Sequence, residues 1–466
     1  MKVMHLFSLL ASAPFIPEIS DPEEVKKQYG NWRLRIFYSL FFGYVLFYCT
    51  RKSYSYAMPL MIEDLGLSKS DFGILGSIFY LTYGFSKFGT GILSDYCNPR
   101  YFMALGLILT GVLNIAFASS SSIFLFSLFW GFNGLFQGFG WPPITKLLTH
   151  WYHPQERGRW WSLISSSHNI GGGLIPLLVA GVAFSTNWRV AICLPGVMGI
   201  IGGLLLMERL RDVPQSLGLP PIERFKKPEG NPEKSPSPAS SLDETPSASL
   251  LSPRQRFFRQ VLSNRAIWIL SISYFFVYII RTGINDWGSL FLIKQKGYNL
   301  LSAASCMTWL EVGGFCGTLS AGWSTDYFFK GRRVPYMLIC VLGMLLALSA
   351  LWLLPPHNYF VDMLTFASIG FFLFGPQLLI GLAATEYVDK QSACAANGFA
   401  GCFAYLGAAA TGYPLGKIID LWDWQGYFIT LTTCSVLVFF CLGLLLWNQG
   451  QGKRLPKVFT LQEARQ

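Results

Sequence analysis

The sequence predicts an all-α membrane protein whose twelve transmembrane helices form two six-helix halves related by pseudo-two-fold symmetry. Three observations predict this fold. The 466 residues are 52% hydrophobic and only 13% charged, whereas soluble domains carry roughly 25% charged residues. Continuous apolar runs recur with the length of ~20 residues that a helix needs to cross the hydrocarbon layer. Short motifs of the first half return in the second.

The twelve spans are joined by short connections, apart from one long polar segment after the sixth. We expect them at residues 34–56, 70–94, 101–118, 122–146, 159–183, 190–208, 265–293, 300–325, 334–355, 360–386, 393–416 and 425–447. With both termini inside, 27 of the 36 Lys and Arg residues lie in internal segments or at the internal ends of the spans, and 5 lie in external loops. This asymmetry predicts cytoplasmic termini. It also explains the net charge of +11 without a nucleic-acid partner.

The polar segment divides the chain into domains. We expect a cytoplasmic N-terminus at 1–33, a first half at 34–208, a cytoplasmic linker at 209–264, a second half at 265–447 and a tail at 448–466. Lys226 to Ser252 is rich in Pro, Ser and charge, which is typical of a flexible linker. Met1 to Pro14 resembles a short signal peptide. Because the first span requires an internal N-terminus, we do not expect it to be cleaved.

Two motifs recur in the halves at nearly one spacing. Gly91-Ile-Leu-Ser-Asp95 follows the second span, and Gly322-Trp-Ser-Thr-Asp326 follows the eighth. A Tyr-Tyr-Arg set stands in the first span as Tyr44, Tyr48 and Arg51, and 230 residues later in the seventh as Tyr274, Tyr278 and Arg281. Repeats at one offset indicate homologous halves. Parallel halves of this kind hold their substrate between them.

The Tyr-Tyr-Arg sets predict an anion site. Their i, i+4, i+7 spacing places each set on one stripe of its helix, and a two-fold axis would bring the stripes face to face. A guanidinium remains charged and binds phosphate through paired hydrogen bonds. Neither half offers a carboxylate at the same depth, so we expect an anionic substrate between Arg51 and Arg281. The alternative is that each arginine reaches toward the end of its helix.

Two further basic residues lie inside spans of the first half. Lys87 shares a helical face with Tyr80 and Tyr83 and would add a third positive charge. The alternative for Lys87 is a lysine at a helix end. His168 precedes three glycines that allow close helix contact, and its imidazole could respond to a phosphate charge. The alternative for His168 is a core histidine whose hydrogen bonds are satisfied.

Lys52, Asp286 and Glu311 form a second group of charges. Lys52 and Asp286 lie near the external ends of the first and seventh spans, and Glu311 lies in the eighth. Opposite charges on the two halves at similar height predict a salt bridge that closes the external mouth. The alternative is a static interfacial pair.

Enzymatic chemistry is not indicated. No nucleophile–base arrangement and no nucleotide-binding motif stands out, so we expect no catalytic residue and no cofactor. The ten cysteines are scattered without a C-x-x-C pair, which indicates neither a disulfide framework nor a metal site. The expected partners are the lipid bilayer and a small anion, and the expected unit is a monomer.

At these residues the chain resembles a known family. The segments that match are Phe42-Gly-Tyr44, Arg51-Lys52, Ala57-Met-Pro59, Tyr83-Gly-Phe-Ser-Lys87-Phe88, Gly140-Trp-Pro-Pro143, His168-Asn-Ile-Gly171-Gly172-Gly173, Arg281-x4-Asp286-Trp287 and Pro214 to Glu223. Together they resemble the organophosphate:inorganic phosphate antiporter family of the major facilitator superfamily. Its members include glycerol-3-phosphate and hexose-phosphate transporters, a membrane sensor of hexose phosphate, and the glucose-6-phosphate translocase of the endoplasmic reticulum.

The resemblance implies a role for each candidate residue. Arg51 and Arg281 resemble the two phosphate-binding arginines of the family, and Lys87 and His168 its accessory substrate residues. The resemblance also assigns Tyr44, Tyr48, Tyr83 and Tyr405 to the cavity lining, and Lys52, Asp286 and Glu311 to the external gate. One departure is Ile164, where the glycerol-3-phosphate carrier has an aromatic residue one turn before its histidine.

The predicted function is therefore exchange of a hexose phosphate, especially glucose 6-phosphate, for inorganic phosphate by rocker-switch alternating access. The alternatives are glycerol-3-phosphate exchange, a sensor that binds sugar phosphate without transporting it, and a proton-coupled carrier for another anion. The last would need a titrating carboxylate, for which Glu311 is the candidate. The predicted location is a bacterial inner membrane, with an organellar membrane as the alternative.

Overall fold

The predicted spans correspond to the helices of the structure, a computed structural model that describes residues 14–225, 257–355, 358–388 and 392–450. The first half holds α2 (Pro22–Leu65), α3 (Lys69–Tyr96), α4 (Pro99–Ala118), α5 (Ile123–Gln137), α6 (Trp141–Trp151), α7 (Pro154–Ser165), α8 (Ser167–Ser185) and α9 (Trp188–Arg209). The second holds α12 (Arg265–Lys294), α13 (Leu300–Tyr327), α14 (Arg333–Leu353), α15 (Tyr359–Glu386), α16 (Ala393–Ala410) and α17 (Tyr413–Gly450). The all-α prediction is confirmed.

Short polar caps explain where the helices begin. An asparagine side chain accepts a hydrogen bond from the first turn of α4, α9, α12, α13 and α15, through Asn98, Asn187, Asn264, Asn299 and Asn358. Asp21 does the same for α2, and Ser68 and Asp71 form a capping box at α3. These caps satisfy backbone amides that have no partner within the helix, so the connections can remain short.

Two predicted spans are each built from two helices. The span at 122–146 is α5 followed by α6, with a break at residues 138–140. Gly138 and Gly140 are poor helix formers, and Pro142 and Pro143 have no backbone N–H to continue the hydrogen bonding of α5. The span at 159–183 is α7 followed by α8, and the break lies at Ser166, just before His168.

Eight helical stretches among the described residues are long and apolar enough to cross a membrane by length and composition. One of them, Ala395–Gln449, covers the last two predicted spans. The predicted spans in α2, α3 and α13 do not meet that criterion. These three helices carry Arg51, Lys87 and Glu311 among other polar side chains, which lower their mean hydropathy.

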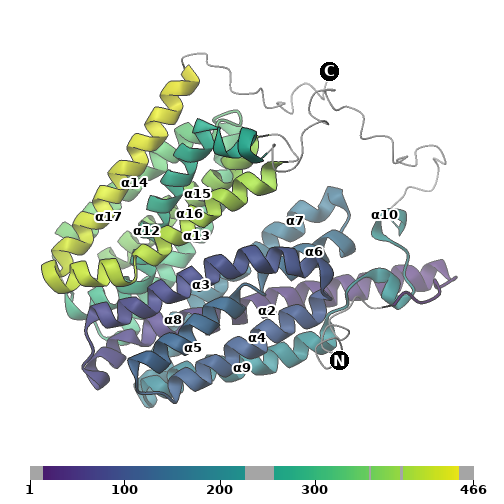
Figure 1. The fold of residues 1–466 in the computed structure, drawn as a ribbon, viewed down its shortest axis with the longest axis horizontal. Helices are drawn as coiled ribbons and strands as arrows, with labels where there is room; N and C mark the ends of the chain where they lie inside the picture. Colours follow the sequence, from purple (N-terminus) through teal and green to yellow (C-terminus); the bar gives the residue numbers. More distant parts are fainter. Residues whose placement is uncertain (1–13, 226–256, 356–357, 389–391, 451–466) are drawn as a thin grey trace.

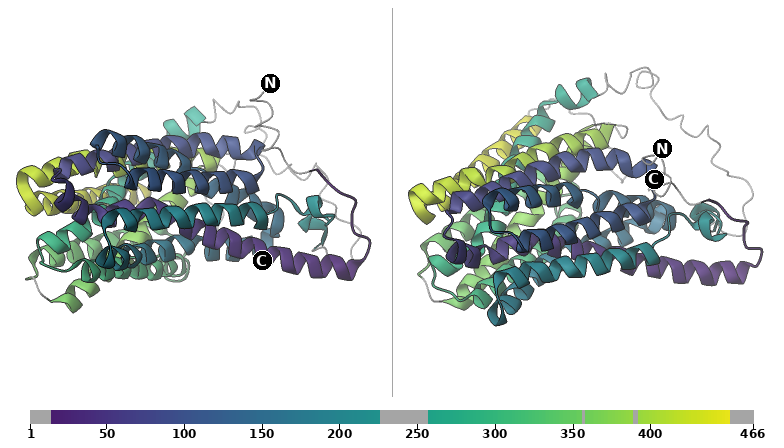
Figure 2. Two further views of the ribbon diagram at one scale, coloured as in Figure 1. Left: turned by 90° about the horizontal axis from the view of Figure 1, so that it is seen from below. Right: turned by 60° about the horizontal axis from the view of Figure 1, so that its bottom comes forward.

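The two halves meet at one end of the bundle. Figure 1 shows them converging where α2 ends and α3 begins, and diverging toward the end where α2 begins and α10 (Ile222–Phe225) lies. Across the halves, α3 contacts α16 and α17, α8 contacts α13, and α2 contacts α12. We call the converging end the closed end and the opposite one the linker end. Figure 2 shows α2 projecting beyond the bundle at the linker end.

The buried apolar residues follow the same division. A large cluster includes residues of both halves, such as Phe72 and Trp130 of the first and Trp287 and Leu431 of the second. A second cluster, which includes Trp151, is confined to the first half. The hydrophobic contact between the halves is therefore concentrated at the closed end.

The start of the predicted linker is folded onto the first half. The rings of Tyr29 and Phe225 stack with centroids 4.1 Å apart. The backbone amides of Ile16 and Ile19 donate to the carbonyls of Gln215 and Gly218. This part of the linker is thus part of the first half, while Lys226 to Ser252 lies outside the described residues.

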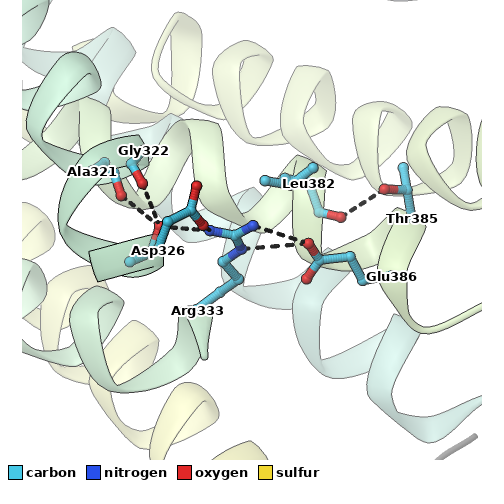
Figure 3. A network of polar contacts seen from close by, with 8 residues as sticks. Ala321, Gly322, Asp326, Arg333, Leu382, Thr385 and Glu386 are labelled. Atoms are coloured by element: carbon cyan, nitrogen blue, oxygen red, sulfur yellow. Dashed lines mark hydrogen bonds and ion pairs between the residues drawn. The ribbon is translucent and has the colours of Figure 1, made fainter. Parts of the chain in front are cut away.

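The repeated motif at the end of α13 forms a polar network at the linker end of the second half. Arg333 donates to Asp326 at 2.6 Å and to Thr325 at 2.6 Å, and it pairs with Glu386 at 3.3 Å. Figure 3 shows that Arg333 lies between these groups, so it joins α13 to α15. In the first half the equivalent Asp95 has a side chain outside the described part of the chain.

Candidate functional site

Arg51 of α2 and Arg281 of α12 converge on one phenol between the halves. The Cζ atom of Arg51 lies 4.6 Å from the ring centroid of Tyr48 and 4.5 Å from that of Tyr83. Arg281 also interacts with the Tyr48 side chain across the halves. Its Cζ atom lies 5.5 Å from the Tyr278 ring and 5.2 Å from the Phe374 ring. The two arginines predicted from the repeat are therefore brought together.

Neither arginine forms an ion pair with a carboxylate of the described residues. The Nε atom of Arg51 is buried and donates to none of them. Aromatic rings surround both guanidiniums, and cation–π contacts hold them without neutralising their charge. A buried charge without an ion-pair partner is costly, so this arrangement favours an anion between the two side chains.

The predicted tyrosines pack against one another within each stripe. Tyr44 packs against Tyr48, with centroids 5.6 Å apart, and against Trp141 of α6 at 5.1 Å. On the other half, Tyr274 and Tyr278 pack edge to face at 4.9 Å. Phenol hydroxyls among apolar rings can donate hydrogen bonds to phosphate oxygens without adding charge.

Lys87 connects the halves through Tyr405 of α16. Its Nζ donates to the Tyr405 hydroxyl at 3.2 Å. The Tyr405 ring lies 4.9 Å from the Tyr83 ring and 5.9 Å from the Tyr278 ring. A Cβ atom on Gly84 would lie 2.9 Å from that of Tyr405, so glycine at position 84 lets α3 and α16 approach this closely. Lys87 forms no ion pair with a described carboxylate.

His168 follows the break between α7 and α8 and faces both arginines. Its Nδ1 atom is hydrogen-bonded to the carbonyl oxygen of Ser165. Its ring lies 5.8 Å from the Tyr48 ring and is parallel to Phe374 at 6.5 Å, and the charges of Arg281 and Arg51 act on it. The carbonyl contact places the Nδ1 proton toward Ser165 and leaves Nε2 as the nitrogen for a ligand.

An ion pair joins the halves on the closed-end side of the arginines. Lys52, which is 9% exposed, lies with its Nζ 2.9 Å from Asp286 Oδ1. Asp286 also accepts hydrogen bonds from Ser55 at 3.0 Å and Tyr80 at 2.8 Å. The carboxylate of α12 therefore receives three donors from α2 and α3, two of which sequence reasoning did not assign to it.

Glu311 lies nearby and is not part of that ion pair. It is 3% exposed, and its Oε2 atom accepts no hydrogen bond within the described ranges. A Cβ atom on Gly172 would lie 2.8 Å from its Cδ atom, and Thr308 one turn earlier donates to the carbonyl of Gly173 at 2.8 Å. Glu311 thus packs α13 against α8. The charges of Lys52 and Arg281 act on its carboxylate, but neither residue forms an ion pair with it.

The structure adds a second polar seam at the closed end. Asp420 accepts a hydrogen bond from the backbone amide of Ser70 at 2.8 Å, so the second half caps the first turn of α3. Lys294 pairs with Glu63 at 2.6 Å. A Cβ atom on Gly73 would lie 2.6 Å from the Gly412 carbonyl oxygen. Sequence reasoning missed these contacts. The available signal for a close approach of the two segments was the glycine at positions 73 and 412.

Comparisons with known proteins identify the family of the chain. Residues 40–412 match the family model described as Major Facilitator Superfamily. The chain is 51% identical over 452 residues to the probable hexose phosphate transport protein of Chlamydia trachomatis serovar D, covering 96% of this chain and 98% of that protein. It is 44% identical over 430 residues to the membrane sensor protein UhpC of Salmonella typhimurium strain LT2, covering 92% and 95%.

A third relative and two solved structures complete the comparison. The glycerol-3-phosphate transporter of Bacillus subtilis strain 168 is 36% identical over 452 residues, covering 96% of this chain and 99% of that protein. The fold is similar to an inward-facing, occupied crystal structure of a bacterial homolog of the human lysosomal transporter Spinster, at a TM-score of 0.69, 16% identity and coverages of 90% and 97%. The nucleoside transporter NupG matches at a TM-score of 0.66 and 15% identity, with coverages of 89% and 99%.

Proposed function

This chain belongs to the Major Facilitator Superfamily, in its organophosphate:phosphate antiporter family, and we propose that it exchanges a hexose phosphate for inorganic phosphate by rocker-switch alternating access. Glucose 6-phosphate is the proposed organic substrate. The single observation that carries the proposal is that Arg51 and Arg281, neither of which has an ion-pair partner in the described chain, both interact with Tyr48.

The charge balance of the site fits a phosphate. Arg51, Arg281 and Lys87 carry three positive charges without an ion-pair partner in the described chain, and Lys52 and Asp286 neutralise each other. Glu311 is the remaining nearby carboxylate and forms no ion pair. A phosphate group brings up to two negative charges and several acceptor oxygens, which guanidiniums bind through paired hydrogen bonds.

The same charges explain why exchange would be obligatory. To change its direction of access, the carrier must bring the halves together at the linker end and part them at the closed end. An empty site would then hold two unpaired guanidiniums in a drier space, and desolvating unpaired charge is expensive. A bound phosphate or organophosphate neutralises the pair, so only a loaded carrier crosses over readily.

A hexose phosphate is favoured over glycerol 3-phosphate by the relatives. The protein named as a probable hexose phosphate transporter is 51% identical to this chain, and the one named as a glycerol-3-phosphate transporter is 36% identical. We further propose a bacterial inner membrane as the location, with both termini cytoplasmic and the closed end outside.

A flux measurement in proteoliposomes tests the proposal. Purified protein would be reconstituted, and uptake of labelled glucose 6-phosphate would be followed with and without phosphate inside. We expect uptake to require internal phosphate and to be inhibited by excess external phosphate. Uptake at the same rate into phosphate-free vesicles would contradict antiport, and stronger inhibition by glycerol 3-phosphate than by glucose 6-phosphate would contradict the substrate.

A second candidate function is a sensor that binds hexose phosphate without transporting it. The observation that favours it is the 44% identity to a protein named as a membrane sensor. Calorimetric titration of the same purified protein with glucose 6-phosphate separates the two functions. Saturable binding together with the absence of any flux would establish the sensor and exclude the carrier.

A further inference from the structure

A stripe of α15 leads away from the arginines toward the linker end. Phe374, Gln377 and Gly381 are spaced i, i+3 and i+7, so they share one helical face. Phe374 contacts Arg281, with the ring centroid 5.2 Å from its Cζ. A Cβ atom on Gly381 would lie 3.7 Å from the hydroxyl of Tyr274 and 3.2 Å from Oδ1 of Asn397. Both ends of the stripe therefore face the region between the halves.

This placement fixes the level of Gln377. The helices α12 and α15 run antiparallel, with Phe374 beside Arg281 and Gly381 beside Tyr274. At a rise of ~1.5 Å per residue, Gln377 lies roughly 4 to 5 Å from the level of Phe374, and Gly381 roughly 10 Å from it. A sugar ring attached to a phosphate between the arginines would extend into this interval.

The amide groups on this face are available to a ligand. The Oε1 atom of Gln377 is buried and accepts no hydrogen bond from the described residues. Asn397 of α16 is exposed and makes no hydrogen bond to another described side chain or backbone group. A buried amide oxygen without a donor costs roughly 1–3 kcal/mol. Each amide can both donate and accept, as a sugar hydroxyl does.

The first half presents different chemistry at this level. Tyr44 is two turns from Arg51, as Tyr274 is from Arg281, and its neighbour is Trp141 at 5.1 Å. The aromatic rings offer apolar faces, which suit the C–H faces of a sugar ring. The arginine and tyrosine stripes repeat in both halves, whereas Gln377 and Asn397 both belong to the second half. The two halves would therefore contact the organic part of the substrate differently.

We propose that Gln377 and Asn397, with the hydroxyl of Tyr274, form a subsite that binds the hydroxyl groups of the sugar moiety. We call it the hydroxyl subsite. It rests on the proposed function, because it assumes a phosphate held between the arginines. Inorganic phosphate is too small to reach the subsite from there. The hydroxyl subsite therefore sets the affinity for the organophosphate without affecting that for phosphate.

Phosphate self-exchange supplies an internal control. The variants Gln377→Met and Asn397→Leu keep the approximate side-chain volume and remove hydrogen bonding. Leu378→Ala is the matched control, since Leu378 is the next residue of α15 and is 43% exposed on another face. Each protein would be assayed in phosphate-loaded proteoliposomes for uptake of labelled phosphate and of labelled glucose 6-phosphate.

We expect each subsite variant to raise the half-saturation concentration for glucose 6-phosphate by about threefold to tenfold while phosphate self-exchange keeps its parent value. Analogues that lack one ring hydroxyl should lose affinity in the parent, and at least one of them should lose none in Gln377→Met. Equal changes for both substrates, or none for either, would overturn the subsite. Parent protein that exchanges no phosphate would instead overturn the proposed function.

Discussion

At the residue scale, the identity of the cations matters as much as their charge. Arg51 and Arg281 are each packed against two aromatic rings, which orient the planar guanidinium. A lysine would keep the positive charge and lose the paired hydrogen bonds and the stacking. The site therefore requires the geometry of a guanidinium at both positions, and a positive charge alone is not sufficient.

This distinction gives a first prediction. Arg51→Lys and Arg281→Lys should each lower phosphate self-exchange by roughly ten- to a hundredfold, because one charge-assisted hydrogen bond contributes about 1.5–3 kcal/mol. Initial rates in proteoliposomes measure the effect. Arg332→Lys is the control, since Arg332 is exposed in the connection before α14. Parent rates in both site variants would show that charge alone is sufficient.

The ion pair between Lys52 and Asp286 gives a second prediction. Removing either partner leaves a buried charge, which costs about 3–5 kcal/mol, whereas replacing both with apolar residues is often tolerated. Lys52→Met and Asp286→Leu should each abolish most of the exchange, and the double variant should be more active than either. Exchange rates of the four proteins form the cycle. Additive losses would mean that the two residues act separately.

Helical spacing made the residue-scale predictions accurate where a whole stripe shares one face. The sequence placed Tyr44, Tyr48 and Arg51 together because i, i+4 and i+7 are neighbours on any helix. It could not place Tyr80 beside Asp286, since their contact depends on how deep two helices of different halves sit. The sequence also grouped Glu311 with Lys52 and Asp286, because the relative depth of α13 cannot be read from its spacing. In the structure Glu311 packs against Gly172 instead.

At the element scale, glycines set how closely the helices pack. A Cβ atom on Gly313 of α13 would lie 1.9 Å from the carbonyl oxygen of Ala367, and one on Gly370 of α15 would lie 1.9 Å from that of Leu310. Both obstacles are backbone atoms, which cannot rotate away. The contact between α13 and α15 thus depends on the absence of side chains.

A third prediction follows for α13. Gly313→Ala should destabilise the protein by at least 1–3 kcal/mol, the usual cost of overpacking. Gly322→Ala in the same helix should be neutral or slightly stabilising, because nothing lies within 4 Å of a Cβ atom there. Thermal unfolding in detergent compares the two variants. Equal melting temperatures would show that the helices can separate without loss of stability.

The sequence predicted the existence and order of the elements well, and their internal breaks poorly. Continuous apolar runs indicated the spans at 122–146 and 159–183 because hydropathy does not change at a break between two helices. Gly138, Gly140 and the two following prolines were the available signal for the first break. The break at Ser166 lies between residues that all tolerate a helix, and tertiary packing decides it.

At the scale of the whole molecule, the closed end combines a large apolar contact with modest polar ones. Lys294 and Glu63 remain 39% and 58% exposed in their side chains, and such pairs contribute little stability. The buried ion pair of Lys52 and Asp286 lies between this rim and the arginines. An interface of this kind can separate when the opposite end closes around a neutralised site.

The repeat and the charge distribution revealed this architecture from the sequence alone, because both persist whatever the relative position of the halves. The degree of closure at each end could not be predicted. It depends on the balance between the apolar contact at the closed end and the cost of two unpaired guanidiniums. Neither free energy can be predicted from the sequence of one transmembrane helix.

The central claim is that Arg51 and Arg281 block the crossing of an empty carrier. The most direct measurement is release of labelled phosphate from loaded proteoliposomes into buffer that contains either no substrate anion or glucose 6-phosphate. We predict negligible release into the anion-free buffer and rapid release once glucose 6-phosphate is added. Equal release into both buffers would show that the empty carrier crosses freely and would contradict the account.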